Sequence, residues 1–239
     1  MKKITLFLGI ALVSLFGVGV SHECFGGMVV EEVHKDQAGR ASKILRYFSG
    51  NQFRTDDSET GLTVVIDFKN DRMVMIDHRS KSFIETKFSQ WEREVAERLK
   101  KESPGVQPKS RKIDVRKTGE TAMLNGFQTE KIEIWADREL IEENWVTRDV
   151  EIKDIESVMG KVAQGFSRDF RLEMKEGREI YEKLKSYGFP ILIKDYTLTH
   201  GLGGIDVLEV KKIEKKELKE DVFLPPIDYR KIIPIPPKK

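Results

Sequence analysis

The two neighbouring segments Leu62-Thr63-Val64-Val65-Ile66-Asp67-Phe68 and Arg72-Met73-Val74-Met75-Ile76-Asp77 decide the fold class of this chain. Each is a short run of β-branched and other apolar residues, and Asn70-Asp71 between them is typical of a tight turn. Because side chains along a strand alternate between the two faces of a sheet, Val64 and Val65 point in opposite directions. Both faces of this hairpin are therefore apolar, and each needs a cover from elsewhere in the chain.

Similar short runs precede and follow this hairpin. The connections between them hold turn residues and are too short for the crossover that a parallel neighbour requires, so the pattern predicts an antiparallel meander. The expected strands cover residues 28–35, 42–49, 52–56, 62–68, 72–77 and 82–86.

Helices and further strands are expected downstream. Apolar residues at helical spacing predict an amphipathic helix from near Ser89 to the turn Ser103-Pro104-Gly105. Two more helical stretches are expected over residues 152–166 and 180–187, with a break between them over 170–177. The remaining strands are expected over residues 112–118, 127–135, 144–148, 191–199 and 205–213.

Together these elements, about ten strands and three helices, predict an α+β fold: a large curved antiparallel sheet (half-barrel) with helices covering its concave side. Neither half of the chain has enough strands to hide its own apolar face, so residues 27–224 are predicted to form a single domain. Residues 225–239 are rich in proline and are predicted to be an extended tail on the surface.

The first 26 residues have the pattern of a secretory signal peptide. Lys2 and Lys3 precede a run without charge over residues 4–21, and small residues stand before a cut after Gly26. We therefore expect a mature chain that begins at Gly27 and is periplasmic or secreted.

Three alternatives for this N-terminal segment remain open. Residues 4–20 lie at the lower limit of about 17–25 residues for a membrane span, so the segment is also compatible with an uncleaved anchor. A cut after Ser21 would leave Cys24 on a short tail. Lipid attachment at Cys24 is disfavoured, because the preceding Ser21-His22-Glu23 does not suit a lipoprotein signal.

The composition argues against several classes of function. The 42 basic and 40 acidic residues nearly balance, which disfavours a nucleic-acid partner. Cys24 is the only cysteine, so a cut after Gly26 removes every thiol. The dense run of mixed charges over residues 209–221 is expected to be a solvated face, with peripheral contact to acidic lipid headgroups as the alternative.

Catalytic and metal-binding motifs are not apparent in the sequence. His34, His78 and His200 stand near predicted strand ends, outside the spacing of metal ligands, and are expected to be exposed. The pairs Glu31-Glu32 and Glu142-Glu143 are expected to be solvated, since neighbours on a strand point to opposite faces. Without a nucleophile turn or a facing acid–base pair, we expect no enzyme activity, no cofactor and no metal.

Several local sequences follow one another in an order typical of one protein superfamily. They are Tyr47-Phe48-Ser49-Gly50-Asn51-Gln52-Phe53-Arg54, the runs over 64–67, 72–77 and 81–85, Gly126-Phe127-Gln128-Thr129-Glu130-Lys131, Asn144-Trp145-Val146-Thr147-Arg148-Asp149, and Val222-Phe223-Leu224-Pro225 with Tyr229. In this order they make the chain similar to the LolA/LolB/LppX-like lipoprotein-carrier superfamily, and most nearly to a branch of secreted bacterial proteins with that fold. The resemblance spans nearly the whole mature chain.

The resemblance implies a half-closed barrel whose helices, over residues 149–187, close the mouth of an apolar cavity for a lipid or acyl chain. By position, Arg54 is the candidate for the arginine that holds the lid of such carriers closed. The residues expected to contact the guest are Val64, Ile66, Met73, Met75, Phe83, Trp135, Trp145, Val158, Val162 and Phe166.

We therefore expect a binding protein that holds a lipid or acyl chain without catalysis, with lipids or acylated proteins as partners. The alternative is a cell-envelope protein-interaction or sensor module whose core is filled by its own side chains and whose partner is an envelope protein. These two interpretations differ in whether the space between sheet and helices is left for a guest.

Overall fold

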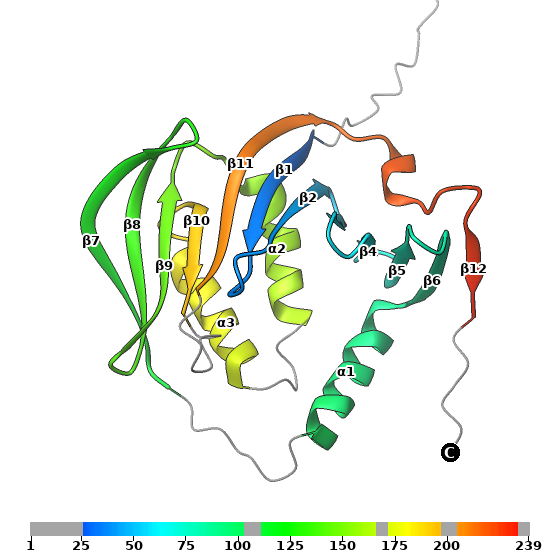
Figure 1. The fold of residues 1–239 in the computed structure, drawn as a ribbon, viewed down its shortest axis with the longest axis horizontal. Helices are drawn as coiled ribbons and strands as arrows, with labels where there is room; N and C mark the ends of the chain where they lie inside the picture. Colours follow the sequence, from blue (N-terminus) through cyan, green and yellow to red (C-terminus); the bar gives the residue numbers. More distant parts are fainter. Residues whose placement is uncertain (1–25, 103–110, 166–171, 197–204, 234–239) are drawn as a thin grey trace, which may run out of the picture.

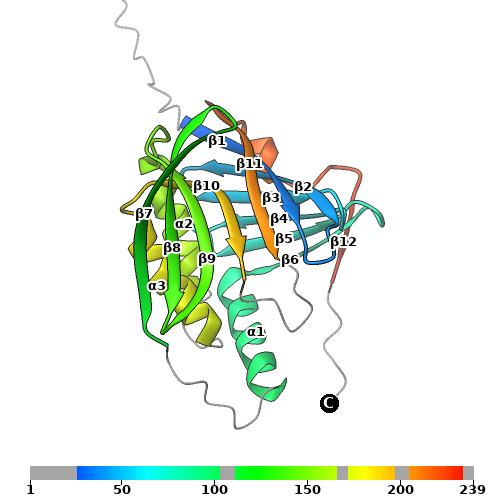
Figure 2. The same ribbon diagram turned by 60° about the vertical axis from the view of Figure 1, so that its left-hand side comes forward.

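The structure, a computed structural model, describes residues 26–102, 111–165, 172–196 and 205–233. The strands in these ranges form one twelve-stranded sheet in the order β12-β6-β5-β4-β3-β2-β1-β11-β10-β9-β8-β7. The sheet is strongly curved, and the three helices lie on the side that it encloses, which we call the concave face (Figures 1 and 2). The predicted α+β half-barrel is confirmed.

The bounds of the elements are as follows. The strands are β1 (Gly26–Lys35), β2 (Ala41–Ser49), β3 (Gln52–Asp57), β4 (Leu62–Asp67), β5 (Arg72–Asp77), β6 (Ser82–Lys87), β7 (Ile113–Leu124), β8 (Phe127–Ala136), β9 (Glu139–Thr147), β10 (Phe189–Asp195), β11 (Asp206–Glu217) and β12 (Arg230–Ile232). The helices are α1 (Phe88–Glu102), α2 (Lys153–Gly165) and α3 (Leu172–Leu184), with a short 3-10 turn η1 (Glu220–Phe223).

Strands β1 to β6 form the predicted antiparallel meander, and each begins and ends within two residues of its expected bounds. The turn before β5 is tight: Asp71 has a φ of 50°, a conformation that Asp and Asn tolerate better than most residues. Its carboxylate accepts hydrogen bonds from the backbone N–H and the hydroxyl of Ser89, at 2.8 and 2.7 Å, near the start of α1. The turn therefore also fixes where the helix begins.

Strand β1 joins the two halves of the chain. It pairs with β2 on one side and with β11 on the other, so that Gly26–Lys35 lies beside residues from near the C-terminus. Since the first strand of the N-terminal meander takes its second neighbour from the C-terminal half, the described strands form one continuous sheet.

Two expectations about the C-terminal half need correction. Helix α3 begins at Leu172, inside the stretch where a break was predicted. The apolar pattern did not show this part of the helix, because the buried residue Glu176 is charged and pairs with Arg111. Residues 225–239 are not all a surface tail, since β12 pairs in parallel with β6 and so adds an edge strand to the sheet. The Gly-rich turn expected over residues 201–204 lies outside the described residues.

The convex face of β4 and β5 is covered by the segment over residues 218–233, which we call the C-terminal segment. Phe223 is 1% exposed and packs on Val65, Val74 and Ile76, the residues that alternate with those of the concave face. The sequence required a cover for this second apolar face, and the C-terminal segment supplies it.

Arg54 serves the convex face rather than a lid. Its guanidinium donates to the backbone carbonyl of Val222 at 2.5 Å and to Asp56 at 2.8 Å. Its position on β3, opposite Val65, puts the side chain on the same face as the C-terminal segment. The expectation that Arg54 holds a lid on the concave side is therefore wrong.

Gly188 is required by close packing between backbones. It has a φ of 139°, and a Cβ atom at this position would lie 2.2 Å from the carbonyl oxygen of Thr147 on β9. Only glycine allows the chain leaving α3 to approach β9 this closely. The sequence predicts this glycine as the residue that follows a helix end, but α3 already ends at Leu184.

Replacing Gly188 tests this packing. We expect Gly188→Ala to lower the free energy of unfolding by roughly 2 kcal/mol or more, since neither backbone is free to move away. Denaturant unfolding followed by circular dichroism measures the change. Gly160→Ala in α2 is the matched control, because no atom lies within 4 Å of its Cβ position; it should be neutral or stabilising by up to about 1 kcal/mol. Equal effects of the two substitutions would contradict the explanation.

The cover on the convex face is tested separately. Phe223→Ala should cost about 3–5 kcal/mol of unfolding free energy, because it empties the space above Val65 and Val74. The adjacent residue Leu224 is 47% exposed, so Leu224→Ala should change stability by about 0.5 kcal/mol or less. Thermal unfolding of both variants gives the comparison, and a stable Phe223→Ala protein would show that the C-terminal segment does not hold this face.

Candidate functional site

An apolar strip crosses the concave face on β4 and β5. Val64 lies opposite Met75, and Ile66 lies opposite Met73, so these four side chains share one face. Ile66 and Met73 are buried beneath Phe88 of α1, whereas Val64 and Met75 remain half-buried. We call these four residues the apolar strip.

Aromatic rings bound the apolar strip at one end. Phe68 meets Phe88 edge-on, with 5.3 Å between ring centres, and Phe88 stacks on Trp91 at 6.0 Å. The ammonium group of Lys161 in α2 lies 5.7 Å from the Phe68 ring and donates to Asn51 at 2.5 Å. Side chains of both α1 and α2 thus meet at Phe68.

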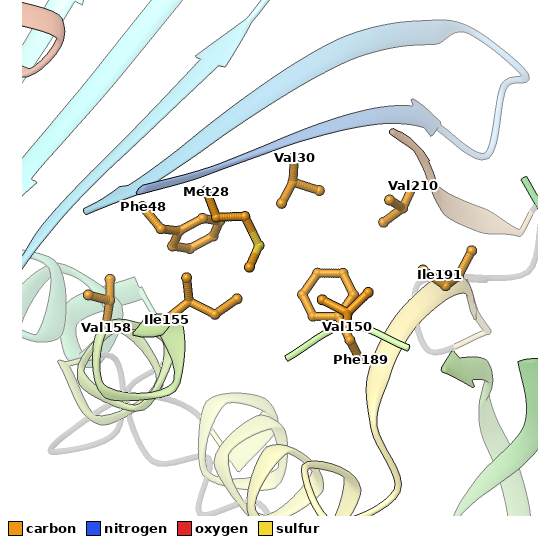
Figure 3. Close-up of a cluster of buried hydrophobic side chains, with 9 residues drawn as sticks. All are labelled: Met28, Val30, Phe48, Val150, Ile155, Val158, Phe189, Ile191 and Val210. Atoms are coloured by element: carbon orange, nitrogen blue, oxygen red, sulfur yellow. The ribbon is translucent and has the colours of Figure 1, made fainter. Parts of the chain in front are cut away.

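Beside the strip, α2 packs directly on the sheet. Ile155 and Val158 are 1% and 0% exposed, and Figure 3 shows them beneath the side chains of β1 and β2. The buried cluster comprises Met28, Val30, Phe48, Val150, Ile155, Val158, Phe189, Ile191 and Val210. Phe53 and Phe68 pack against both this cluster and the strip, so the apolar surface is continuous.

Helix α3 covers the other end of the concave face. Ile180 and Leu184 pack on Ile132, Ile134 and Val146 of β8 and β9. The buried carboxylate of Glu176 accepts two hydrogen bonds from Arg111, at 2.9 and 2.5 Å, which anchors the start of α3 to the segment before β7.

The structure brings together only part of the predicted site. Val64, Ile66, Met73 and Met75 form the apolar strip, and Val158 lies in the adjoining cluster. Val162 belongs to α2, but its side chain is outside what the structure describes, and Phe166 lies outside the described residues.

Three predicted aromatic residues lie on the convex face instead. Phe83 packs with the residues beneath the C-terminal segment. The indole N–H of Trp135 donates to Glu133 at 3.0 Å, and the guanidinium of Arg116 lies 4.6 Å from the centre of its ring. Trp145 lies between Asn144 and Val146 on β9, whose buried side chains face α3, so its own side chain points to the opposite face. The expectation that they line the guest site is wrong, because strand parity rather than side-chain size decides the face.

A set of acidic residues on the concave face was missed by the sequence analysis. Glu142 of β9 lies opposite Asp195 of β10, and Asp195 lies opposite Asp206 of β11. Directly opposed residues share a face with their Cβ atoms roughly 5 Å apart. We call Glu142, Asp195 and Asp206 the acidic row. His34 of β1 forms a short hydrogen bond to Asp206 at one end of the row.

Two polar side chains near the acidic row are almost completely buried. Asn144 is 0% exposed and donates to Glu142 at 3.0 Å, but its Oδ1 accepts no hydrogen bond from any described residue. Glu32 is 3% exposed, and its Oε2 lies 3.2 Å from Nε of Arg46 without the geometry of a hydrogen bond. An unsatisfied acceptor of this kind is costly and calls for an explanation.

Burial raises the pKa of both Glu142 and Glu32. For Glu142, loss of solvation is the largest cause, the hydrogen bond from Asn144 opposes it, and the charge of Asp195 adds to the increase. For Glu32, the charges of Arg46 and His34 partly offset the loss of solvation. Both carboxyl groups therefore hold a proton to higher pH than a solvated glutamate.

These findings correct the expectation that the carboxylate pairs are solvated. Glu143 and Glu31 are paired with lysines on the convex side, as the alternation predicts, but their neighbours Glu142 and Glu32 point inward. Spacing alone does not reveal this, because the sheet's curvature decides which face is enclosed.

The histidines are also less exposed than predicted. His78 on the convex side is half-buried and interacts through Nδ1 with the hydroxyl of Tyr229 at 2.9 Å and through Nε2 with Thr63 at 2.8 Å. His34 is half-buried on the concave side, and His200 lies outside the described residues.

Residues that could bind a metal ion do not cluster in the described part of the chain. No group of three or more His, Cys, Asp or Glu residues within it is arranged to hold a metal ion. A pocket of about 470 Å³ lies between α2 and α3, and most of the residues that line it are polar or charged: Lys153, Glu156, Ser157, Gly160, Lys161, Tyr181, Glu182 and Lys185. Within the same residues, no helix combines the length and the apolar character that a membrane span needs.

Residues 25–229 match the family model described as a domain of unknown function, DUF4412. The chain belongs to the DUF4412 family. No curated protein matches its sequence. The match includes Tyr229 and so extends beyond the predicted domain boundary at residue 224, as the structure also does.

Solved structures similar to this DUF4412 protein share little sequence with it. An uncharacterized conserved protein from Thermus thermophilus is 9% identical with a TM-score of 0.48, and the match covers 86% of this chain and 89% of that one. A chain of the MucA/MucB complex of Pseudomonas aeruginosa is 9% identical with a TM-score of 0.41, covering 83% of this chain and 55% of that one.

A LolA superfamily protein from Nitrosomonas europaea is also among the similar structures. It is 9% identical with a TM-score of 0.29, and the match covers 84% of this chain and 90% of that one. At these identities and scores, none of the structural likenesses carries an argument about what the DUF4412 chain binds.

The buried position of Glu142 predicts how stability depends on pH. Its pKa is raised above 4.5 in the folded state, so the folded protein binds this proton more tightly than the unfolded chain. Stability from this group is complete below pH 4.5 and is lost as the pH rises through the folded pKa. Glu142→Gln removes this loss, so the variant should become more stable relative to the parent between pH 4 and pH 8.

Urea unfolding of both proteins at pH 4, 6 and 8 measures this dependence. The pKa shift of Glu32 is present in both proteins and cancels in the difference. Glu97→Gln, on an exposed side chain of α1, is the control and should show no such trend. A stability difference between parent and Glu142→Gln that stays constant with pH would show that the pKa of Glu142 is not raised on folding.

Proposed function

We propose that this DUF4412 protein is an exported binding protein that holds a lipid or acyl chain against the concave face of its sheet, without catalysis. The apolar strip carries the proposal. Val64 and Met75 remain half-buried in the bend of the sheet, although α1 and α2 both reach the same surface. Half-buried apolar side chains in a concave, helix-flanked position suit an apolar guest.

The energetics of such binding require no reactive group. Each methylene of an acyl chain that leaves water contributes about 0.8 kcal/mol, so a chain of moderate length binds by burial alone. Methionine side chains adapt to guests of differing shape because they are unbranched and polarizable. Met73 and Met75 put two of them on the strip.

Export is part of the proposal and rests on the sequence. Residues 1–26 carry the signal-peptide pattern, and the described sheet begins at Gly26, directly beside the expected cut. Determination of the N-terminus of the protein from a cell envelope fraction tests it: a mature N-terminus at or near Gly27 supports export, and an intact Met1 contradicts cleavage.

Uptake of a fluorescent fatty acid by the purified protein tests guest binding. We expect saturable binding, and we expect Met75→Glu to weaken it at least about tenfold, because a carboxylate on the strip opposes apolar burial. Met123→Glu is the matched control, since Met123 is 64% exposed on β7, and it should bind like the parent. Thermal unfolding of both variants establishes that they are folded.

Two results would contradict the proposal. A parent protein that takes up no probe and releases no lipid on organic extraction has a concave face without a guest. Equal binding by Met75→Glu and Met123→Glu would place the probe away from the strip.

A second candidate function, a protein-interaction module of the cell envelope, is favoured by the C-terminal segment. Four large apolar residues of this segment are exposed: Leu224, Ile227, Ile232 and Ile233, at 47%, 104%, 38% and 81%. The close packing of Ile155 and Val158 also shows that α2 fills part of the concave face with the chain's own side chains. An envelope protein that covers these isoleucines is the partner that this interpretation requires.

Capture of envelope proteins on the immobilised chain distinguishes the two functions. If the second function holds, Ile227→Ser with Ile233→Ser abolishes capture of a specific partner while fatty-acid uptake stays absent. Met123→Ser is the control for loss of an exposed apolar residue elsewhere. These point substitutions are preferable to removal of residues 225–239, because that deletion also removes β12 from the sheet.

A further inference from the structure

The acidic row places three carboxyl groups close together. Three carboxyl groups on adjacent strands, Glu142, Asp195 and Asp206, face the same enclosed side of the sheet. Asp206 is 19% exposed and receives a hydrogen bond from His34, and Glu142 receives one from Asn144. Carboxylates collected in this way attract a cation and tolerate each other poorly without one.

The buried amide of Asn144 provides an independent indication of a ligand. Its NH₂ group donates to Glu142, and its Oδ1 is left without a donor among the described residues. The residue is 0% exposed. A buried acceptor without a partner, directly beside the acidic row, fits a donor brought by a ligand.

The neighbouring side chains are apolar on the side toward the α2 cluster. Next to the row on the same face lie Ile193 and Leu208, which oppose each other on β10 and β11. Beyond them, Ile191 and Val210 belong to the buried cluster. A ligand that reaches the acidic row is thus adjacent to apolar surface along its length.

We propose that the acidic row and Asn144 bind the primary ammonium group of an amine-bearing amphiphile whose alkyl chain lies along Ile193 and Leu208. An ammonium group carries three N–H donors, which match Oδ1 of Asn144 and the carboxylates of Glu142 and Asp195. Hydrogen bonds between charged partners are stronger than those between neutral ones, so the site selects the charged head rather than the tail. This inference rests on the proposed function and specifies the class of guest.

A comparison of the affinities of two ligands of equal chain length tests the proposal. Dodecylamine and dodecan-1-ol differ in charge but share the same tail, and each is titrated into the full mature chain by calorimetry at pH 7.5. We expect the amine to bind at least about tenfold more tightly than the alcohol, the gain from one charge-assisted hydrogen bond.

Isosteric variants locate the head group. Asp195→Asn, and separately Glu142→Gln, should bring the amine down to the affinity of the alcohol while leaving the alcohol unchanged. The control is Glu143→Gln on the opposite face of β9, where the carboxylate pairs with Lys194, and it should bind both ligands like the parent.

The outcomes separate this inference from the proposed function. Equal affinity for amine and alcohol in the parent overturns the ammonium site but leaves lipid binding intact. Binding of neither ligand overturns both. A preference for the amine that survives both Asp195→Asn and Glu142→Gln overturns the assignment to the acidic row.

Discussion

Pairing between β1 and β11 is the constraint on which the rest of the structure depends. It brings Gly26–Lys35 beside Asp206–Glu217 and so merges an N-terminal meander with a C-terminal set of strands into one curved sheet. Only this merger creates the concave face, because the buried cluster under α2 takes residues from β1, β2, β10 and β11 together. Loop closure between such distant segments is entropically costly, and burial of that cluster offsets the cost.

Two different surfaces meet on the concave face. Toward β4 and β5 it is apolar and half-covered, and toward β9, β10 and β11 it carries carboxyl groups that solvent reaches poorly. Burying ionisable groups costs stability, and a fold that needed only a filled core would use apolar residues there. The combination of an apolar wall with an acidic end therefore supports a guest with two chemically distinct ends.

The convex face of β4 and β5 is apolar and is covered by the chain itself. Residues that alternate with the apolar strip are themselves apolar, and the C-terminal segment crosses the sheet to cover them with Phe223. Arg54 secures this segment through the carbonyl of Val222. The cover leaves several isoleucines of the same segment exposed, which is why a protein partner is a reasonable second interpretation of the family's role.

The sequence by itself determined the meander, the amphipathic helices, the need for two covers on β4 and β5, and the single continuous sheet. These follow from local periodicity and turn chemistry, which act over a few residues. It did not determine the inward position of Glu32 and Glu142, the outward position of Trp135 and Trp145, the true place of Arg54 or the parallel strand β12. The alternation of side chains along a strand shows that neighbouring residues point to opposite faces of the sheet. Only the curvature of the assembled sheet and the pairing of distant strands decide which face is enclosed.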